Sequence, residues 1–204
     1  MTAQVSELRS DARDNRARIL AVARMAFATD GLDVPVREIA RRADVGPATV
    51  YRHFPTKEAL YTAAFAEQMA LCSAVVEEGL AAPDPWQGFC LVIEKLMEMH
   101  ALDRGFSRAF TSRFPDYFTA ERDRALTAML ELVRRAKRSG DLRQDFVLED
   151  VILTLMANEG IRADSPEARV AASRRLTALM LQSFRANPAP APLPPPARLP
   201  LVAR

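Results

Sequence analysis

The 204-residue sequence is poor in several features, and each shortage narrows the class of protein. Cys72 and Cys90 are too few for a disulfide framework and match no paired metal spacing, so we expect both to be reduced and buried. Outside the proline-rich C-terminus, no segment free of Asp, Glu, Lys and Arg exceeds nine residues, about half of what a membrane-spanning helix needs. The N-terminus lacks the apolar core of a signal peptide. These absences predict a cytoplasmic protein without a membrane-spanning helix.

Patterns typical of enzymes and metal sites are equally scarce. The chain has two histidines, His53 and His100, and no GxSxG, P-loop, HExxH or dinucleotide-binding fingerprint. We therefore expect no catalytic activity, no cofactor and no metal. Redox sensing by the two cysteines is less favoured than simple burial, because a reactive thiol needs an exposed, electropositive surrounding that the sequence does not indicate.

Helices, by contrast, are strongly indicated. The chain has only seven glycines, it lacks the β-branched runs expected of strands, and apolar residues recur three and four positions apart. The sequence therefore predicts an all-α protein. Gly31 is expected to end the first helix, Thr56 to cap the helix that follows it, and Ser165 with Pro166 to open the last. The expected helices cover about 11–30, two short segments from 36 and from 47, then 57–80, 85–101, 104–113, 118–139, 148–163 and 166–186.

The C-terminus has a composition of its own. Seven of the fourteen prolines fall in the last eighteen residues, which predicts an extended, mobile tail over 187–204. A proline-rich ligand for an aromatic groove is the alternative, but a solvated overhang is the commoner outcome of such compositions. We assign the tail no function.

The segment VREIARRADVGPATVYRHFPTK, from Val36 to Lys57, has the form of a helix-turn-helix. Two helices of about eight residues are joined by a three-residue turn, so that the first can brace the second in the major groove of DNA. Asp44 falls at a turn position that needs an unusual backbone angle, which short polar residues tolerate. The expected shared core is Ile39, Ala40, Ala43, Val45 and Val50. Spacing alone fits a helical hairpin with a merely solvated face about as well.

Residues of the second helix outside this core have the chemistry of DNA contacts. Ala48 and Thr49 are compact enough to touch a thymine methyl group or a base edge, and Arg52 can reach a guanine. Hydroxyl, imidazole and cationic groups suit phosphate oxygens. The candidate DNA-binding residues are Arg37, Pro47, Ala48, Thr49, Tyr51, Arg52, His53 and Lys57.

The residues themselves resemble a known family. The run REIA, followed by ADVGPATVYRHFPTKEAL, is similar to the DNA-binding signature of the TetR family of bacterial transcriptional regulators, over roughly residues 12–70. Family members often have Gly, Ser and Gly where this chain has Asp44, Gly46 and Ala48, which puts details of the contacts in question. The resemblance implies a homodimer whose N-terminal domains occupy successive major grooves of a palindromic operator. It also implies C-terminal domains that pair and bind a small effector.

The same resemblance suggests the domain organisation and the dimer contacts. The expected parts are an N-terminal arm (1–11), a three-helix DNA-binding domain (12–71, with the helix-turn-helix at about 36–54), an effector-binding and dimerisation domain (72–186) and the tail (187–204). The last two helices are apolar on several sides, so a second copy of the chain could cover them. The candidate dimer residues are Val151, Ile152, Leu155, Met156, Leu176, Leu179 and Met180. Simple core packing is the alternative for these residues.

Effector contacts are expected in the middle helices, which the resemblance implies enclose a cavity. Apolar and aromatic stripes with a few polar groups suit a hydrophobic small molecule, although plain core packing also produces such stripes. The candidates are Phe65, Gln68, Cys72, Trp86, Phe89, Ile93, Met97, His100, Phe110 and Met129. His100 and Gln68 are the expected polar contacts.

Together these observations predict a ligand-responsive regulator that binds double-stranded DNA, most simply a repressor released by a small hydrophobic effector. Activation of transcription is an alternative, and so is a protein-interaction role without an effector. The presence of Tyr51, Arg52, His53 and Lys57 favours a protein that binds DNA.

Overall fold

The computed structural model describes the chain over residues 2–113 and 119–187, and its side chains over 14–108, at 110 and over 123–187. Within these residues the fold is all-α, as expected, with one isolated β-bridge between Leu142 and Arg185. The predicted tail lies outside the described residues from 188 onward. The helices are α1 (Thr2–Asp30), α2 (Val36–Arg42), α3 (Pro47–His53), α4 (Lys57–Ala81), α5 (Pro85–Leu102), α6 (Arg104–Arg113), α7 (Thr119–Arg138), α8 (Leu148–Glu159) and α9 (Pro166–Phe184).

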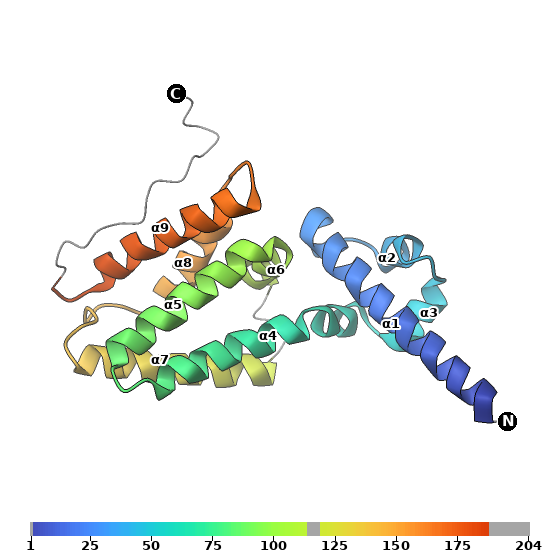
Figure 1. Cartoon of the computed structure of the whole chain (residues 1–204), viewed down its shortest axis with the longest axis horizontal. Coiled ribbons are helices and arrows are strands. Elements are labelled where there is room, and N and C mark those ends of the chain that lie inside the picture. Colours follow the sequence, from blue (N-terminus) through green and yellow to red (C-terminus); the bar gives the residue numbers. More distant parts are fainter. Residues whose placement is uncertain (1, 114–118, 188–204) are drawn as a thin grey trace.

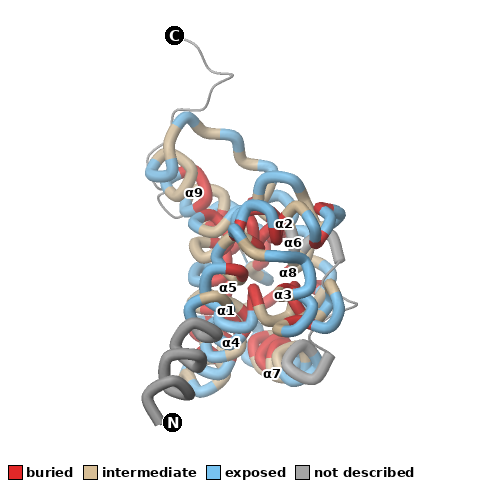
Figure 2. The backbone as a smooth tube through the Cα atoms, turned by 90° about the vertical axis from the view of Figure 1, so that its right-hand side faces the viewer, coloured by how far each residue is buried: buried red, intermediate tan, exposed pale blue. Residues whose placement is uncertain are grey.

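The helices form two regions, a small N-terminal head of α1–α3 and a larger body of α5–α9 (Figure 1). Helix α4 starts at the head and runs along the body, where it packs against α5 and α7. The expected division between residues 71 and 72 falls inside this continuous helix. Figure 2 shows that buried segments occur in both regions. The buried apolar residues of the head and the body form one connected core.

The expected helix ends are present. Gly31 has a left-handed φ of 84°, which ends α1. Thr56 Oγ1 accepts a hydrogen bond from Ala59 N at 3.0 Å, and Ser165 Oγ accepts one from Ala168 N at 3.1 Å. Each of these caps satisfies a backbone amide that has no partner inside its helix.

Two helix boundaries differ from the expected ones by more than two residues. Helix α1 begins at Thr2 rather than near residue 11, so most of the predicted N-terminal arm is helical. No Gly or Pro occurs between Met1 and Asp30 to interrupt the helix. Helix α8 ends at Glu159 rather than at 163, because Gly160, a poor helix former, follows it.

The head and the body meet at an aromatic cluster and a close helix contact. The rings of Phe27 and Tyr61 lie 5.7 Å apart, and those of Phe65 and Phe106 lie 5.9 Å apart. Beside them α6 approaches α1 so closely that a Cβ atom at Gly105 would lie 2.6 Å from the Cβ of Ala28. Helices α4 and α6 therefore both connect the body to the head.

Helix α4 is also the one described helix that is long and apolar enough to cross a membrane, judged by length and composition alone. It has Glu67 near its middle, and its buried residues pack in the core against α1, α5 and α7. This is the arrangement of a central helix in a folded core.

Candidate nucleic-acid interface and buried cavity

The turn between α2 and α3 has the geometry that the helix-turn-helix prediction requires. Asp44 has a φ of 52°, the only positive φ of a non-glycine residue among those described. Val45 N donates to Ala40 O at 3.0 Å, which closes the turn. Ile39 and Val50 are fully buried between the two helices, so α2 braces α3 as expected.

The predicted DNA-binding residues lie on the open side of the head. Tyr51 is 50% exposed, and Arg37, Pro47, Ala48 and Arg52 are exposed as well. Thr49, His53 and Lys57 are half-buried. Because Pro47 occupies the first turn of α3, where an amide lacks a helical partner anyway, the helix starts without loss of a hydrogen bond. Seven of the eight predicted residues thus lie on α3 and at the start of α4, and Arg37 lies at the start of α2.

Among the predicted DNA-binding residues, His53 turns back toward the protein. Its Nε2 atom is buried and has no hydrogen-bond partner, and its ring lies 6.2 Å from that of Phe54. Burial, helped by the nearby charges of Arg52 and Arg16, lowers the pKa of His53 from its usual value. A neutral imidazole is therefore favoured at this position.

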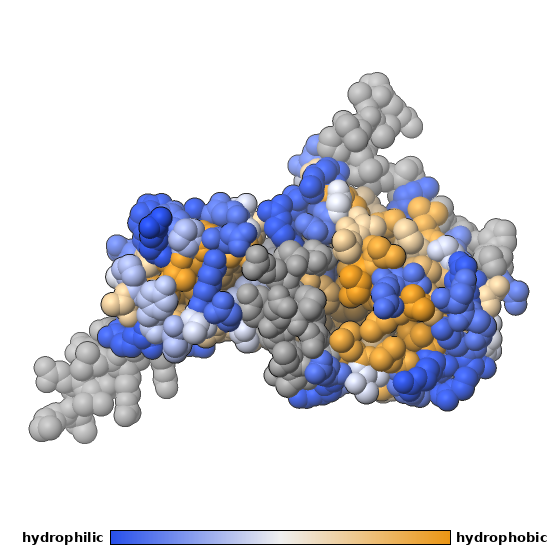
Figure 3. All heavy atoms as spheres, turned by 180° about the vertical axis from the view of Figure 1, so that it is seen from behind, coloured by the Kyte–Doolittle hydropathy of each residue, from blue (hydrophilic) through white to orange (hydrophobic). Residues whose placement is uncertain are grey.

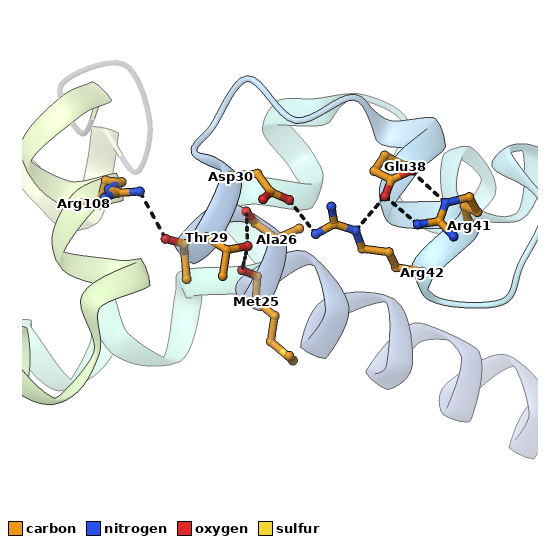
Figure 4. Close-up of polar contacts among 9 residues, drawn as sticks. Met25, Ala26, Thr29, Asp30, Glu38, Arg41, Arg42 and Arg108 are labelled. Atoms are coloured by element: carbon orange, nitrogen blue, oxygen red, sulfur yellow. Dashed lines mark hydrogen bonds and ion pairs between the residues drawn. The ribbon is translucent and has the colours of Figure 1, made fainter. Parts of the chain in front are cut away.

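Ion pairs engage two arginines of α2 within the head (Figure 4). Glu38 accepts hydrogen bonds from Arg41 and from Arg42, and the two guanidinium groups hold its pKa at about 2. Arg42 also pairs with Asp30 at 2.5 Å, which ties α2 to the end of α1. These two arginines are thus engaged within the head. Nothing in the local sequence distinguishes them from the remaining cations of the head.

Three cations on the open side have no such engagement. Among the described residues, Arg37, Arg52 and Lys57 make no ion pair with a carboxylate. Positive side chains that are not neutralised inside the protein are available to the phosphates of nucleic acid. These three are the basic residues that the sequence singled out.

The body contains a small apolar cavity of about 60 Å³ between α4, α5, α6, α7 and α8. The described residues that line it are Met69, Cys72, Val76, Leu96, His100, Phe110, Ala125, Leu126, Met129, Leu148, Val151, Ile152 and Leu155. Four of the ten predicted effector residues are among them, namely Cys72, His100, Phe110 and Met129.

The other six predicted effector residues lie elsewhere. Phe65 belongs to the aromatic cluster between head and body, and Gln68 is half-buried on α4 without lining the cavity. Trp86 and Phe89 stack 5.6 Å apart in a second aromatic cluster, together with Phe146 and Phe184. Ile93 and Met97 are buried in the body core. A stripe on one helix shows that its residues are buried, but it does not show which neighbour they face, and for this reason six of the ten lie outside the cavity lining.

His100 is the polar residue of the cavity lining. It is 1% exposed, and its Nδ1 lies 3.2 Å from Ser107 Oγ. Burial lowers the pKa of His100 to about 4, so the imidazole is neutral at pH 7. Its Nε2 atom has no partner. His100 is thus not an exposed histidine, although it lies near the end of α5.

Both cysteines are free thiols, but only one is fully buried as expected. Cys72 is buried beside the cavity, whereas Cys90 is half-buried. Burial raises the pKa of each thiol to about 12. Neither thiol is thus activated as a nucleophile. Among the described residues, no three His, Cys, Asp or Glu side chains are grouped as metal ligands would be.

Comparison with known proteins agrees with the geometry of the head. Residues 19–64 match the model of bacterial regulatory proteins of the tetR family, and residues 84–186 match that of the SbtR-like transcriptional regulator C-terminal domain. The HTH-type transcriptional repressor KstR of Mycolicibacterium smegmatis is 32% identical over 148 residues, which are 69% of this chain and 72% of KstR. This chain belongs to the TetR family.

Solved structures of TetR-family proteins share the fold. A TetR transcriptional regulator from Streptomyces coelicolor is 28% identical, with a TM-score of 0.51 over 83% of this chain and 98% of its own. The ketosteroid transcriptional regulator KstR2 of Mycobacterium tuberculosis has a TM-score of 0.64 over 83% of this chain and 94% of its own, at 17% identity. The protein is therefore a DNA-binding transcriptional regulator of the TetR family, a family of regulators rather than of enzymes.

The structure divides the predicted dimer residues of this TetR-family chain into two sets. Val151 and Leu155 are 5% and 3% exposed and, with Ile152, line the cavity, so these three do not fit the predicted dimer contact. Met156 and Leu179 are 49% and 43% exposed, as a dimer contact requires. Leu176 and Met180 are half-buried, and α8 also exposes Leu153, which the sequence analysis missed. The sequence signal for Leu153 was its position three residues before Met156, which places both on the same face of the helix.

Proposed function

We propose that the protein is a repressor that binds an inverted-repeat operator as a homodimer and is released by a small hydrophobic effector. The observation that carries the proposal is that one helix, α4, belongs to both functional regions. Lys57 at its start lies beside α3 on the open side of the head, and Met69, Cys72 and Val76 further along line the cavity. A ligand in the cavity thus contacts the helix that supports the DNA-binding surface.

The cavity is joined to the head by a second helix as well. Helix α6 places Phe110 in the cavity lining and Gly105 against Ala28 of α1. Arg108 donates a hydrogen bond to the Ala28 carbonyl oxygen at 3.4 Å. With no space for even a methyl group at Gly105, a displacement of α6 must be passed to α1.

Small displacements of the recognition helices suffice for such regulation. The recognition helices of a dimer must lie about 34–36 Å apart, or a multiple of it, to enter major grooves on one side of the duplex. A coupling free energy of about 1–3 kcal/mol between the cavity and the head would weaken operator binding about 5–150-fold. An effector that fills the cavity without changing operator affinity by even twofold contradicts the proposed release.

A homodimer is supported by the exposed apolar residues of the last two helices. Leu153 and Met156 on α8, and Leu179 on α9, would leave water on association. Figure 3 shows a broad apolar area on the rear face of the body, larger than scattered surface residues would give. The name of the Mycolicibacterium relative supports repression as the outcome of DNA binding.

Selection from a random DNA pool tests the DNA-binding part of the proposal. The purified protein is incubated with random duplex DNA at near-physiological salt, and the retained fraction is sequenced. Enrichment of an inverted repeat is expected, because two symmetry-related heads should read two half-sites. An enriched single half-site contradicts the dimer, and no enrichment by folded protein contradicts specific DNA binding.

Matched substitutions test the dimer. Leu153→Glu combined with Leu179→Glu should shift the protein from dimer to monomer in analytical ultracentrifugation, since a buried unpaired charge is costly. Leu71→Glu is the control, because Leu71 is 53% exposed on α4, away from α8 and α9. A dimer that survives the double substitution but not the control would move the interface to α4.

A further inference from the structure

Among the described residues of α4–α9, four buried side-chain atoms have no hydrogen-bond partner: Gln68 Oε1, Ser73 Oγ, His100 Nε2 and Asn158 Oδ1. Of these four residues, only His100 lines the cavity. His100 is almost completely buried, and its Nδ1 is engaged with Ser107 Oγ at 3.2 Å, whereas its Nε2 has no hydrogen-bond partner. A buried polar atom without a partner destabilises a protein, and nearly all such atoms in native structures are satisfied. The imidazole Nε2 therefore needs a hydrogen-bond partner from outside the described residues.

The surroundings of His100 limit what that partner can be. The described residues that line the cavity with it are aliphatic, aromatic or sulfur-containing, and none has a charged side chain. Transfer of an ion into such a cavity is expensive unless a counter-charge awaits it. The buried imidazole is neutral at pH 7, so it offers no counter-charge to a carboxylate or a phosphate.

We propose that His100 Nε2 is the polar anchor of the effector, and that the effector is an uncharged, largely apolar molecule with one hydroxyl or carbonyl group at the buried end. This inference deepens the proposed function, because it rests on the cavity being the effector site. A neutral imidazole nitrogen either donates a hydrogen bond or accepts one, depending on its tautomer. A hydroxyl group can pair with Nε2 in either tautomer, whereas a carbonyl group can pair only with the tautomer in which Nε2 donates.

The anchor also explains how a small cavity can select its ligand. Apolar lining discriminates weakly between molecules of similar shape, whereas an unpaired buried polar group discriminates strongly against molecules that leave it unpaired. His100 contacts the rings of Phe106 and Phe110 on α6, with ring centroids 5.2 and 5.0 Å away. The bound polar group would thus lie beside the helix that touches α1.

Methionine methyl groups provide a direct probe of binding. The full-length protein, labelled with ¹³C at its eight methionine methyl groups, is titrated with toluene, benzyl alcohol, benzoate and benzylamine at pH 7. Met69 and Met129 line the cavity, and Met25, which is 70% exposed on α1, is the internal control. Toluene and benzyl alcohol are too large for the cavity of about 60 Å³ as it stands and must displace its lining side chains on binding. They should therefore shift Met69 and Met129 but not Met25, and the two charged probes should shift neither.

Variants of His100 decide the anchor. His100→Phe keeps a planar ring and removes the nitrogen, so the affinity for benzyl alcohol should fall at least tenfold while the affinity for toluene is retained. His100→Gln, which keeps a polar group, should retain the affinity for benzyl alcohol. If the phenyl ring also excludes toluene, the same comparison in His100→Leu decides. Equal loss of both probes in His100→Leu overturns the proposal. So does tighter binding of benzoate than of benzyl alcohol, or no response at Met69 and Met129 with any probe.

These titrations contain no DNA, so they separate this inference from the proposed function. His100-dependent binding of benzyl alcohol without any effect on operator binding would support the anchor and contradict release by ligand. Operator release by a charged molecule would support the proposed function and contradict the anchor.

Discussion

The head and the body cavity place their functional side chains in opposite ways. In the head, all the candidate DNA contacts except Arg37 are close neighbours on α3 and the start of α4, and most of the candidates are exposed. In the body, the cavity collects side chains from five helices, and they are buried or half-buried. A surface made by one helix follows from local sequence, whereas a cavity follows only from how helices pack. Substitutions in the body core, in the cavity, in the head and at the helix caps test this contrast.

The largest effect is expected for Phe89→Ala. Phe89 is fully buried against Trp86, Phe146 and Phe184, outside the cavity. The substitution should lower the free energy of unfolding by about 3–5 kcal/mol in urea titrations. Leu71→Ala, at an exposed site, should change it by at most about 0.5 kcal/mol. A loss below about 1 kcal/mol, with loss of probe binding in the cavity, would return Phe89 to the effector site.

A pH-dependent effect is expected for His100→Gln. Unfolded His100 takes up a proton below about pH 6.5, but the native protein resists protonation down to about pH 4. Wild-type stability therefore falls as the pH drops through this window, by about 3 kcal/mol from this residue. Glutamine does not titrate, so the stability of the variant relative to wild type should rise by about that amount between pH 7 and pH 4.

Urea unfolding at the two pH values measures this change. His53→Gln is the matched control, because His53 is only half-buried and should give a smaller change. Equal pH dependence in wild type and His100→Gln would show that His100 is not buried as the structure has it.

Two substitutions on the open side of the head should separate base contacts from phosphate contacts. Arg52→Ala should cost about 1–3 kcal/mol at one base pair and relax sequence preference there, whereas Lys57→Ala should weaken binding to all sequences and reduce its salt dependence. Arg134→Ala is the control, since Arg134 is an exposed arginine of α7 paired with Glu131. If Arg52→Ala lowers the affinity for all DNA sequences equally in binding titrations, Arg52 contacts a phosphate rather than a base.

The smallest effect is expected at the helix caps. Thr56→Ala and Ser165→Ala each remove a side-chain acceptor from a backbone amide, at 3.0 and 3.1 Å. Each should lower the free energy of unfolding by about 1 kcal/mol, because a cap acts locally in the head and the body alike. Chemical denaturation of both variants measures this, and a loss in only one of them would mean that the surrounding packing decides the strength of a cap.

The same contrast separates the local features that the sequence predicts from the packing that it does not predict. Asp44 in the turn and Thr56 at its cap were predicted correctly, because each depends on a few consecutive residues. The stripe of α8 was assigned to a dimer contact, but its inner side faces the cavity and Leu153 lies on the outer side. Periodicity shows that a face is apolar, and the same pattern results whether the face meets a partner or its own core.

The all-α class and the helix-turn-helix follow from the amino-acid sequence, because periodicity, capping and turn chemistry act over a few residues. Three other features depend on the packed fold: which middle-helix residues form the cavity, which arginines of the head are engaged by Glu38 and Asp30, and that His100 Nε2 is left without a partner. Those outcomes depend on contacts between segments far apart in the chain, and such contacts are fixed by the packing of whole helices.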